Sequence, residues 1–233
     1  MTESAAGRPP SVPPDRDAAT VVVRPYANPL PLGFFSFGIG MALLAGIGLD
    51  LVPADQIRSV GILLAVFVFP LELLATVMAF LTRDTGAATT LGLFATSWAC
   101  LGGLYVVAPA QRTSVAVGIY LSAFALMLVP LTVVAFFGKR LLGAVLTVSV
   151  LRALLAAAYQ LGAPHSVQLA SGAAALLLVM LAFYAGTAFL VEDVRQHTVL
   201  PVLRRGDARR AIEDDLPDQH GRVPREPGIR RQL

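Results

Sequence analysis

The chain has 233 residues, of which 56% are hydrophobic and only 14% are charged. An ordinary soluble domain is about 25% charged, so this composition argues against a soluble protein and favours a membrane protein. The net charge of +3 does not indicate nucleic-acid binding, because the basic residues gather in the C-terminal tail beside acidic ones, without interleaved aromatic residues.

Long apolar runs fill most of the chain. A bilayer core about 30 Å thick is crossed by about 20 apolar residues of helix. Six runs are long enough, and they cover residues 32–52, 59–81, 87–107, 114–137, 141–161 and 168–191. The intervals between them are too short for another domain, so consecutive helices should be antiparallel. We therefore predict an all-α polytopic membrane protein, a bundle of six transmembrane helices.

The two ends of the chain differ in composition from its middle. The first 27 residues are polar and rich in proline, with no apolar stretch typical of a signal peptide. The last 30 or so residues are charged and contain too few apolar residues to form a core. We predict a disordered N-terminal tail over 1–27, a transmembrane domain over 28–201 and a disordered C-terminal tail over 202–233.

Basic residues predict the orientation, because they are enriched on the cytoplasmic side of membrane proteins. On the side of the two termini lie Arg8, Arg16, Arg24, Arg83, Lys139, Arg140 and nine arginines from Arg195 to Arg231. The opposite side has only Arg58 and Arg112. We predict a multi-pass membrane protein with both termini in the cytoplasm.

The segment before the first span predicts that the first helix starts abruptly. Asn28 is followed by Pro29, Leu30, Pro31, Leu32 and Gly33. The two prolines prevent helix before Pro31, and proline then suits a first helical turn. The Asn28 side chain and the free amides of that turn are placed to meet a carboxylate. A turn that only anchors the helix explains the same residues.

Glu72 and Arg152 are charged residues near the centres of the second and fifth spans. Each would cost about 2.5 to 3.5 kcal/mol at the centre of a lipid-exposed helix, so both should face the bundle interior. One interpretation is a buried ion pair between the two spans. The other is that Arg152 faces a pore and attracts anions.

No motif of a catalytic site is present in the sequence. The three histidines, His165, His197 and His220, lie outside the predicted spans, so none can activate a serine at membrane depth. The chain has neither an H-E-x-x-H motif nor a phosphate-binding glycine loop. We predict that the protein is not an enzyme and uses no cofactor or metal.

Several short segments together resemble a known family. The opening segment from Asn28 to Gly33 resembles the N-P-x-P-L-G signature of the acetate uptake transporters, the succinate-acetate permeases. Tyr184, Ala185, Glu192 and the run Thr198, Val199, Leu200, Pro201 resemble the last helix of that family and its closing segment. The resemblance extends over residues 27–201, which include all six spans.

The resemblance implies a homohexamer in which each protomer carries its own path for acetate and related carboxylates. It places a hydrophobic constriction at Phe37, Trp98 and Val148, and it includes Asn28 and Tyr184 among the residues of the path. Glu72 and Arg152 depart from the family, whose members have a glutamine and an apolar residue at these places.

The function that the resemblance implies is transport of acetate or another small monocarboxylate across the plasma membrane, by a proton-coupled permease or a channel. Its predicted partners are the lipid bilayer, the carboxylate substrate and further copies of the chain. Two alternatives fit the same residues. One is a channel for a neutral solute such as urea, and the other is a non-transporting scaffold or regulatory subunit whose charged C-terminal tail binds a partner.

Overall fold

The apolar runs all form helices in the computed structural model, which describes residues 26–111, 113–195 and 197–204. The α-helices are α1 (Leu30–Gly48), α2 (Ile57–Leu63), α3 (Phe69–Leu81), α4 (Thr85–Val107), α5 (Val115–Gly138), α6 (Arg140–Gln160) and α7 (His165–Arg195). A short 3₁₀ turn precedes α2, and α2 continues through a π-helical turn into α3, so that residues 54–81 form one span. Six helices in this part of the chain are therefore long and apolar enough to cross a membrane, which confirms the predicted fold class.

The helices begin and end a few residues away from the predicted runs, most clearly at α1, at α7 and at the second span, which begins at Ala54. Helix α1 begins at Leu30 and ends at Gly48, so Pro31 lies in the first turn, where its missing N–H group is not needed. Helix α7 is longer than its apolar run at both ends, and His165 is its first residue. Polar residues near a membrane surface can continue a helix without extending the apolar run.

A π-helical turn over Leu64–Val68 interrupts the second span. Pro70 follows it directly in the first turn of α3 and has no N–H group to bond the carbonyl four residues earlier. A π turn is wider than an α turn and shifts the faces of the residues that follow it. Here those residues include Glu72, which is fully buried.

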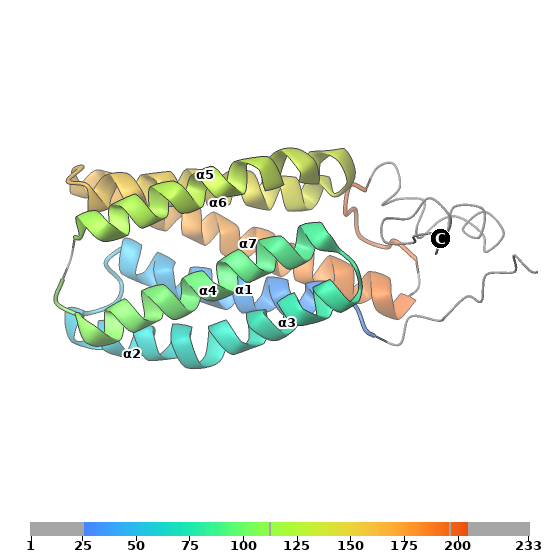
Figure 1. The fold of residues 1–233 in the computed structure, drawn as a ribbon, viewed down its shortest axis with the longest axis horizontal. Coiled ribbons are helices and arrows are strands. Elements are labelled where there is room, and N and C mark those ends of the chain that lie inside the picture. The colour runs from blue at the N-terminus through green and yellow to red at the C-terminus, as the bar shows by residue number, and fades with distance from the viewer. Residues whose placement is uncertain (1–25, 112, 196, 205–233) are drawn as a thin grey trace, which may run out of the picture. The chain divides into compact units, whose positions relative to one another are not determined.

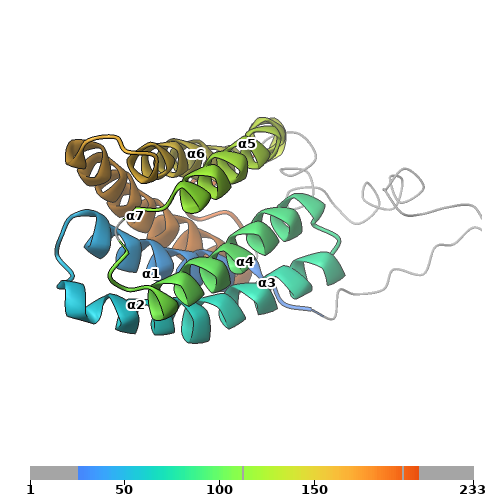
Figure 2. The same cartoon turned by 60° about the vertical axis from the view of Figure 1, so that its left-hand side comes forward.

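The helices form a bundle in which neighbours along the chain are antiparallel (Figures 1 and 2). Helix α5 packs on α6, α6 on α7, α7 on α1 and α1 on α3, while α2 and α3 both pack on α4. Helices α1, α4 and α6 begin at the same end of the bundle and run in the same direction (Figure 1). This parallel arrangement places equivalent turns of the three helices at the same level.

Glycines allow two pairs of helices to approach closely. A Cβ atom built on Gly48 of α1 would lie 2.8 Å from the Gly172 backbone of α7. A Cβ atom on Gly102 of α4 would lie 2.7 Å from the carbonyl oxygen of Gly61 in α2. Small residues at such contacts are typical of membrane helices, which gain van der Waals contact when their backbones approach.

Large apolar side chains cover the outer surfaces of the helices. Val66, Phe137, Met180 and Phe183 are examples, each more than 60% exposed. In water such a surface would favour aggregation, whereas in a bilayer it contacts acyl chains. The exposed apolar residues therefore agree with the membrane class.

The segment after α7 folds back onto the bundle. Val202 is buried, and Arg204 forms an ion pair with Glu192 of α7, with Nη2 and Oε2 2.6 Å apart. Arg204 also pairs with the backbone of Lys139 in the turn between α5 and α6. Residues 202–204, predicted to belong to the C-terminal tail, are thus part of the packed domain. The rest of that tail and residues 1–25 lie outside the described residues.

We predict that Gly102→Ala lowers stability, because its Cβ atom would overlap backbone atoms of α2. Overpacking of this kind costs about 1 to 3 kcal/mol. Thermal unfolding in detergent, followed by circular dichroism, measures the effect. Gly103→Ala is the matched control, since a Cβ atom at Gly103 meets nothing within 4 Å. Equal unfolding midpoints for the two variants would contradict this account of the helix contact.

Candidate functional site

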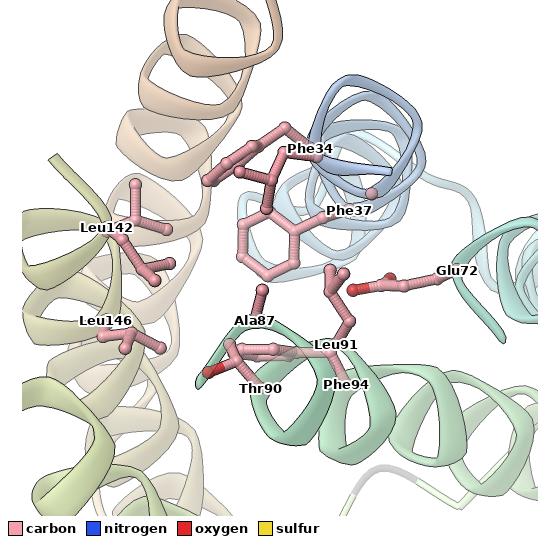
Figure 3. Close-up of a pocket in the computed structure, with 12 residues that line it drawn as sticks. Phe34, Phe37, Glu72, Ala87, Thr90, Leu91, Phe94, Leu142 and Leu146 are labelled. Atoms are coloured by element: carbon pink, nitrogen blue, oxygen red, sulfur yellow. The ribbon is translucent and has the colours of Figure 1, made fainter. Parts of the chain in front are cut away.

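A first cavity lies between the N-terminal halves of α1, α4 and α6 (Figure 3). Its volume is about 20 Å³, room for one or two water molecules. Most of its lining is apolar and includes Phe34, Phe37, Leu91, Phe94, Leu142 and Leu146. Glu72 and Thr90 also line it, and the buried Oε1 and Oγ1 atoms of these two residues have no hydrogen-bond partner among the described residues.

The second cavity lies between the C-terminal halves of the same three helices. Its volume is about 220 Å³, and its lining is more polar than that of the first cavity. The polar residues are Asp50, Tyr105, Gln111, Ser114, Arg152, Tyr159, Gln160, Gln168 and Ser171. The two cavities therefore lie toward opposite ends of the bundle and differ in size and polarity.

A layer of side chains separates the two cavities. Each of the three helices contributes one residue to the first cavity and, about two turns further along, one to the second. These pairs are Phe37 and Leu44 on α1, Phe94 and Leu101 on α4, and Val145 and Arg152 on α6. Between these positions, at helical spacing on the same faces, come Met41, Trp98 and Val148. We call these three residues the central layer. Met41 and Trp98 are buried, and Val148 is partly buried against the core.

Trp98 is held from two sides within this layer. Its indole N–H donates a hydrogen bond to the Glu72 carboxylate on α3. On the other side its ring lies against α1, where a Cβ atom on Gly40 would be only 2.9 Å from the ring carbons. The ring of Phe37 meets the Trp98 ring edge-on, with centroids 6.1 Å apart. A glycine is thus required at residue 40 to leave space for the indole.

The structure brings together some of the predicted site residues. Phe37 and Trp98 are in contact, and Val148 lies at the same level on α6. Asn28 instead accepts a hydrogen bond from the Leu30 N–H group at 3.0 Å, and it lines neither cavity. Tyr184 also lines neither cavity, and its hydroxyl donates to the Pro201 carbonyl at 2.9 Å. Both side chains stabilise segments at the ends of helices.

The predicted ion pair between Glu72 and Arg152 is not formed. Glu72 bonds to Trp98 beside the first cavity, whereas Arg152 lines the second cavity. The two residues therefore lie on opposite sides of the central layer. The sequence suggested similar depths for them because each is near the middle of its apolar run, but the run does not reveal which neighbour a side chain faces.

Sequence reasoning missed Gly40, Met41 and Phe94 as parts of the site. Phe94 packs edge-on against Phe37, with ring centroids 4.8 Å apart, and it lines the first cavity. Each of the three residues lies three or four positions from Phe37 or Trp98 on the same helix. Helical spacing from the two aromatic residues could therefore have identified them.

We predict that Glu72→Leu changes the environment of Trp98, whereas Glu72→Gln does not. Glutamine keeps an oxygen acceptor for the indole, but leucine leaves a buried N–H group unpaired, at a cost of about 1 to 3 kcal/mol. Trp98 is the only tryptophan of the chain, so its fluorescence reports this site directly. We expect emission at shorter wavelength and a lower unfolding temperature for Glu72→Leu alone. Identical spectra for both variants and the wild type would refute the role of the hydrogen bond.

Comparison with known proteins agrees with this architecture. No curated protein matches the chain. The solved structure of the bacterial acetate channel SatP is similar in fold, with a TM-score of 0.67 and 19% sequence identity. The match covers 76% of this chain and 99% of that one. Residues 11–204 match the GPR1/FUN34/yaaH family, which comprises acetate uptake transporters rather than enzymes. Because that match extends over most of its length, the chain belongs to the GPR1/FUN34/yaaH family.

Proposed function

We propose that the protein carries acetate or another small monocarboxylate across the plasma membrane. The observation that carries the proposal is the position of the two cavities, one on each side of the central layer along the same three helices. Membership of the acetate uptake transporter family supports the choice of a carboxylate. In this proposal the substrate passes from one cavity to the other through the layer.

The constriction of this path is formed by Phe37, Trp98 and Val148, with Met41 beside them. These side chains are apolar except for the indole N–H, which is engaged by Glu72. An isolated charge is costly in such surroundings. A carboxylate must therefore lose water or take up a proton before it crosses, which is how a proton-coupled permease or a selective channel would reject hydrated ions.

The unpaired polar atoms of the first cavity support a polar substrate. The Glu72 and Thr90 oxygens are buried there among phenylalanine and leucine side chains. A small carboxylic acid carries a donor and an acceptor that can bond to such groups, and the bonds would offset its loss of water. Asn28 and Tyr184 contribute indirectly in this proposal, by fixing the start of α1 and the segment after α7.

The proposed orientation has both termini in the cytoplasm, so the first cavity faces the cytoplasm and the second faces outward. The excess of basic residues at the first end supports this orientation. Assembly as a homohexamer is proposed from the family resemblance, and the exposed apolar helices offer surfaces for lipid and for neighbouring protomers.

We predict that proteoliposomes containing the protein take up labelled acetate faster than empty vesicles. The rate should rise as the pH falls, because more acetate carries the proton that it needs to cross the central layer. Phe37→Ala and Trp98→Ala should increase uptake of the bulkier butyrate relative to acetate several-fold, since both variants widen the constriction.

Phe183→Ala is the control for these variants, because it removes a ring from the outer surface, where Phe183 is 66% exposed. It should leave the butyrate-to-acetate ratio unchanged. Acetate uptake equal to that of empty vesicles at every pH would refute the proposed function. Transport of urea without transport of acetate would favour a neutral-solute channel instead.

Fusions to reporter proteins test the orientation. We predict that a green fluorescent protein at the C-terminus is fluorescent and that alkaline phosphatase at the same place is inactive, because both report a cytoplasmic location. The same reporters inserted after Pro109, in the turn between α4 and α5, should give the reverse result. Phosphatase activity at the C-terminus would overturn the proposed orientation.

A further inference from the structure

We propose that the second cavity contains a binding site for a small carboxylate anion, built on the guanidinium group of Arg152. The inference deepens the proposed function, on which it rests for the class of substrate. It adds a site that is separate from the central layer and that selects the ionised form of the substrate. The argument starts from the location of Arg152.

Arg152 lies deep within the bundle. It precedes the end of α6 at Gln160 by eight residues, which is about 12 Å along the helix. Arginine inside a membrane span is costly, and such residues generally face a protein interior or a water-filled cavity and mark a substrate pathway. Arg152 follows this rule because it lines the second cavity.

The guanidinium group has no protein partner within residues 26–111, 113–195 and 197–204. Its Nε atom is buried and lacks a hydrogen-bond acceptor. The hydrogen bond that Arg152 receives from a neighbouring side chain among the described residues uses its backbone carbonyl, which accepts from the Ser171 hydroxyl at 3.3 Å. A partly buried cation inside a membrane span is unfavourable without a counter-ion, so an anion that enters the cavity can pair with a guanidinium group that no other anion occupies.

The other polar groups of the cavity are largely engaged elsewhere. Asp50 is paired with His165, with Oδ2 and Nε2 2.9 Å apart, and both side chains are more than half exposed. The Gln160 carbonyl oxygen accepts from the Ser114 N–H group at 2.8 Å, and Gln168 donates to the Ile47 carbonyl at 3.3 Å. The Asp50 carboxylate of the lining is therefore paired with His165, and the guanidinium group of Arg152 is available to a ligand.

The geometry favours a carboxylate over a neutral solute. A guanidinium group presents N–H donors in a planar fork that matches the two oxygens of a carboxylate. The cavity, at about 220 Å³, has room for a small carboxylate with some of its water. Tyr105 lines the same cavity, and its hydroxyl can donate to the same anion.

The proposed binding site lies next to the central layer, on the side of the second cavity. Val148 of the central layer precedes Arg152 by one helical turn, about 6 Å. An anion held by Arg152 would therefore wait next to the point where it must lose its charge or its water. Glu72 lies on the other side of the layer, beside the first cavity. An anion that enters through the second cavity therefore reaches Arg152 before it reaches Glu72.

Binding of acetate by the purified full chain in detergent at pH 7 tests the inference. The relaxation of ¹³C-labelled acetate, measured by NMR during a titration, gives the dissociation constant. Charged hydrogen bonds are strong enough that Arg152→Gln should weaken binding about tenfold or more. Arg152→Lys keeps the charge but loses the fork, so its affinity should be intermediate. If the Arg152→Gln variant does not fold, the affinity of the Arg152→Lys variant still tests the inference.

Arg58→Gln is the matched control. Arg58 is an exposed cation at the same end of the bundle, but it does not line the cavity, so its loss should not change acetate binding. Unchanged affinity in both Arg152 variants, equal weakening in Arg58→Gln, or no binding by the wild type would overturn the inference.

The two proposals can fail separately. If the wild type carries acetate and Arg152→Gln binds and transports it equally well, the site is refuted and the proposed function stands. If acetate binds in an Arg152-dependent manner but no flux is measured in proteoliposomes, the site stands and the proposed function is refuted.

Discussion

One indole side chain joins three helices at the centre of the bundle. Trp98 belongs to α4, donates to Glu72 on α3 and rests against α1 at Gly40. In a membrane interior a buried N–H group and a buried carboxylate are both costly unless they are paired. Their bond therefore fixes the distance between α3 and α4 at the level where the two cavities are divided. Trp98 itself lies in the central layer between the two cavities.

Two backbone features allow that contact. The π-helical turn before Pro70 changes the face on which Glu72 lies, so that its carboxylate reaches Trp98. The close approach at Gly61 and Gly102 brings α2 against α4 one turn beyond the tryptophan. The π-helical turn and Gly61 both belong to the span of residues 54–81. The span thus combines a local change of helix type with a tight helix contact, and the aromatic ring occupies the space that remains.

The six spans were predictable because the thickness of a bilayer dictates the length of an apolar run. Phe37 and Trp98 were located through the resemblance of the chain to its family, and the structure places them in contact. The partner of Glu72 was not predictable, since a long apolar run carries little information about which face of a helix is turned inward. An irregular turn such as Leu64–Val68 makes this harder, because it shifts the helical phase that any periodic pattern assumes. Asn28 and Tyr184 show a related limit: a matched motif identified the residues but not what they bind.

The segment after α7 is linked to the wall of the first cavity through a single ring. Arg204 lies over the face of Phe189, 5.4 Å from the ring centroid, and Phe189 stacks on Phe34 with centroids 5.6 Å apart. Phe34 in turn lines the cavity. Shortening the polypeptide before Arg204, or attaching a bulky tag there, would therefore disturb a transmembrane vestibule, so a purification handle belongs further along the chain.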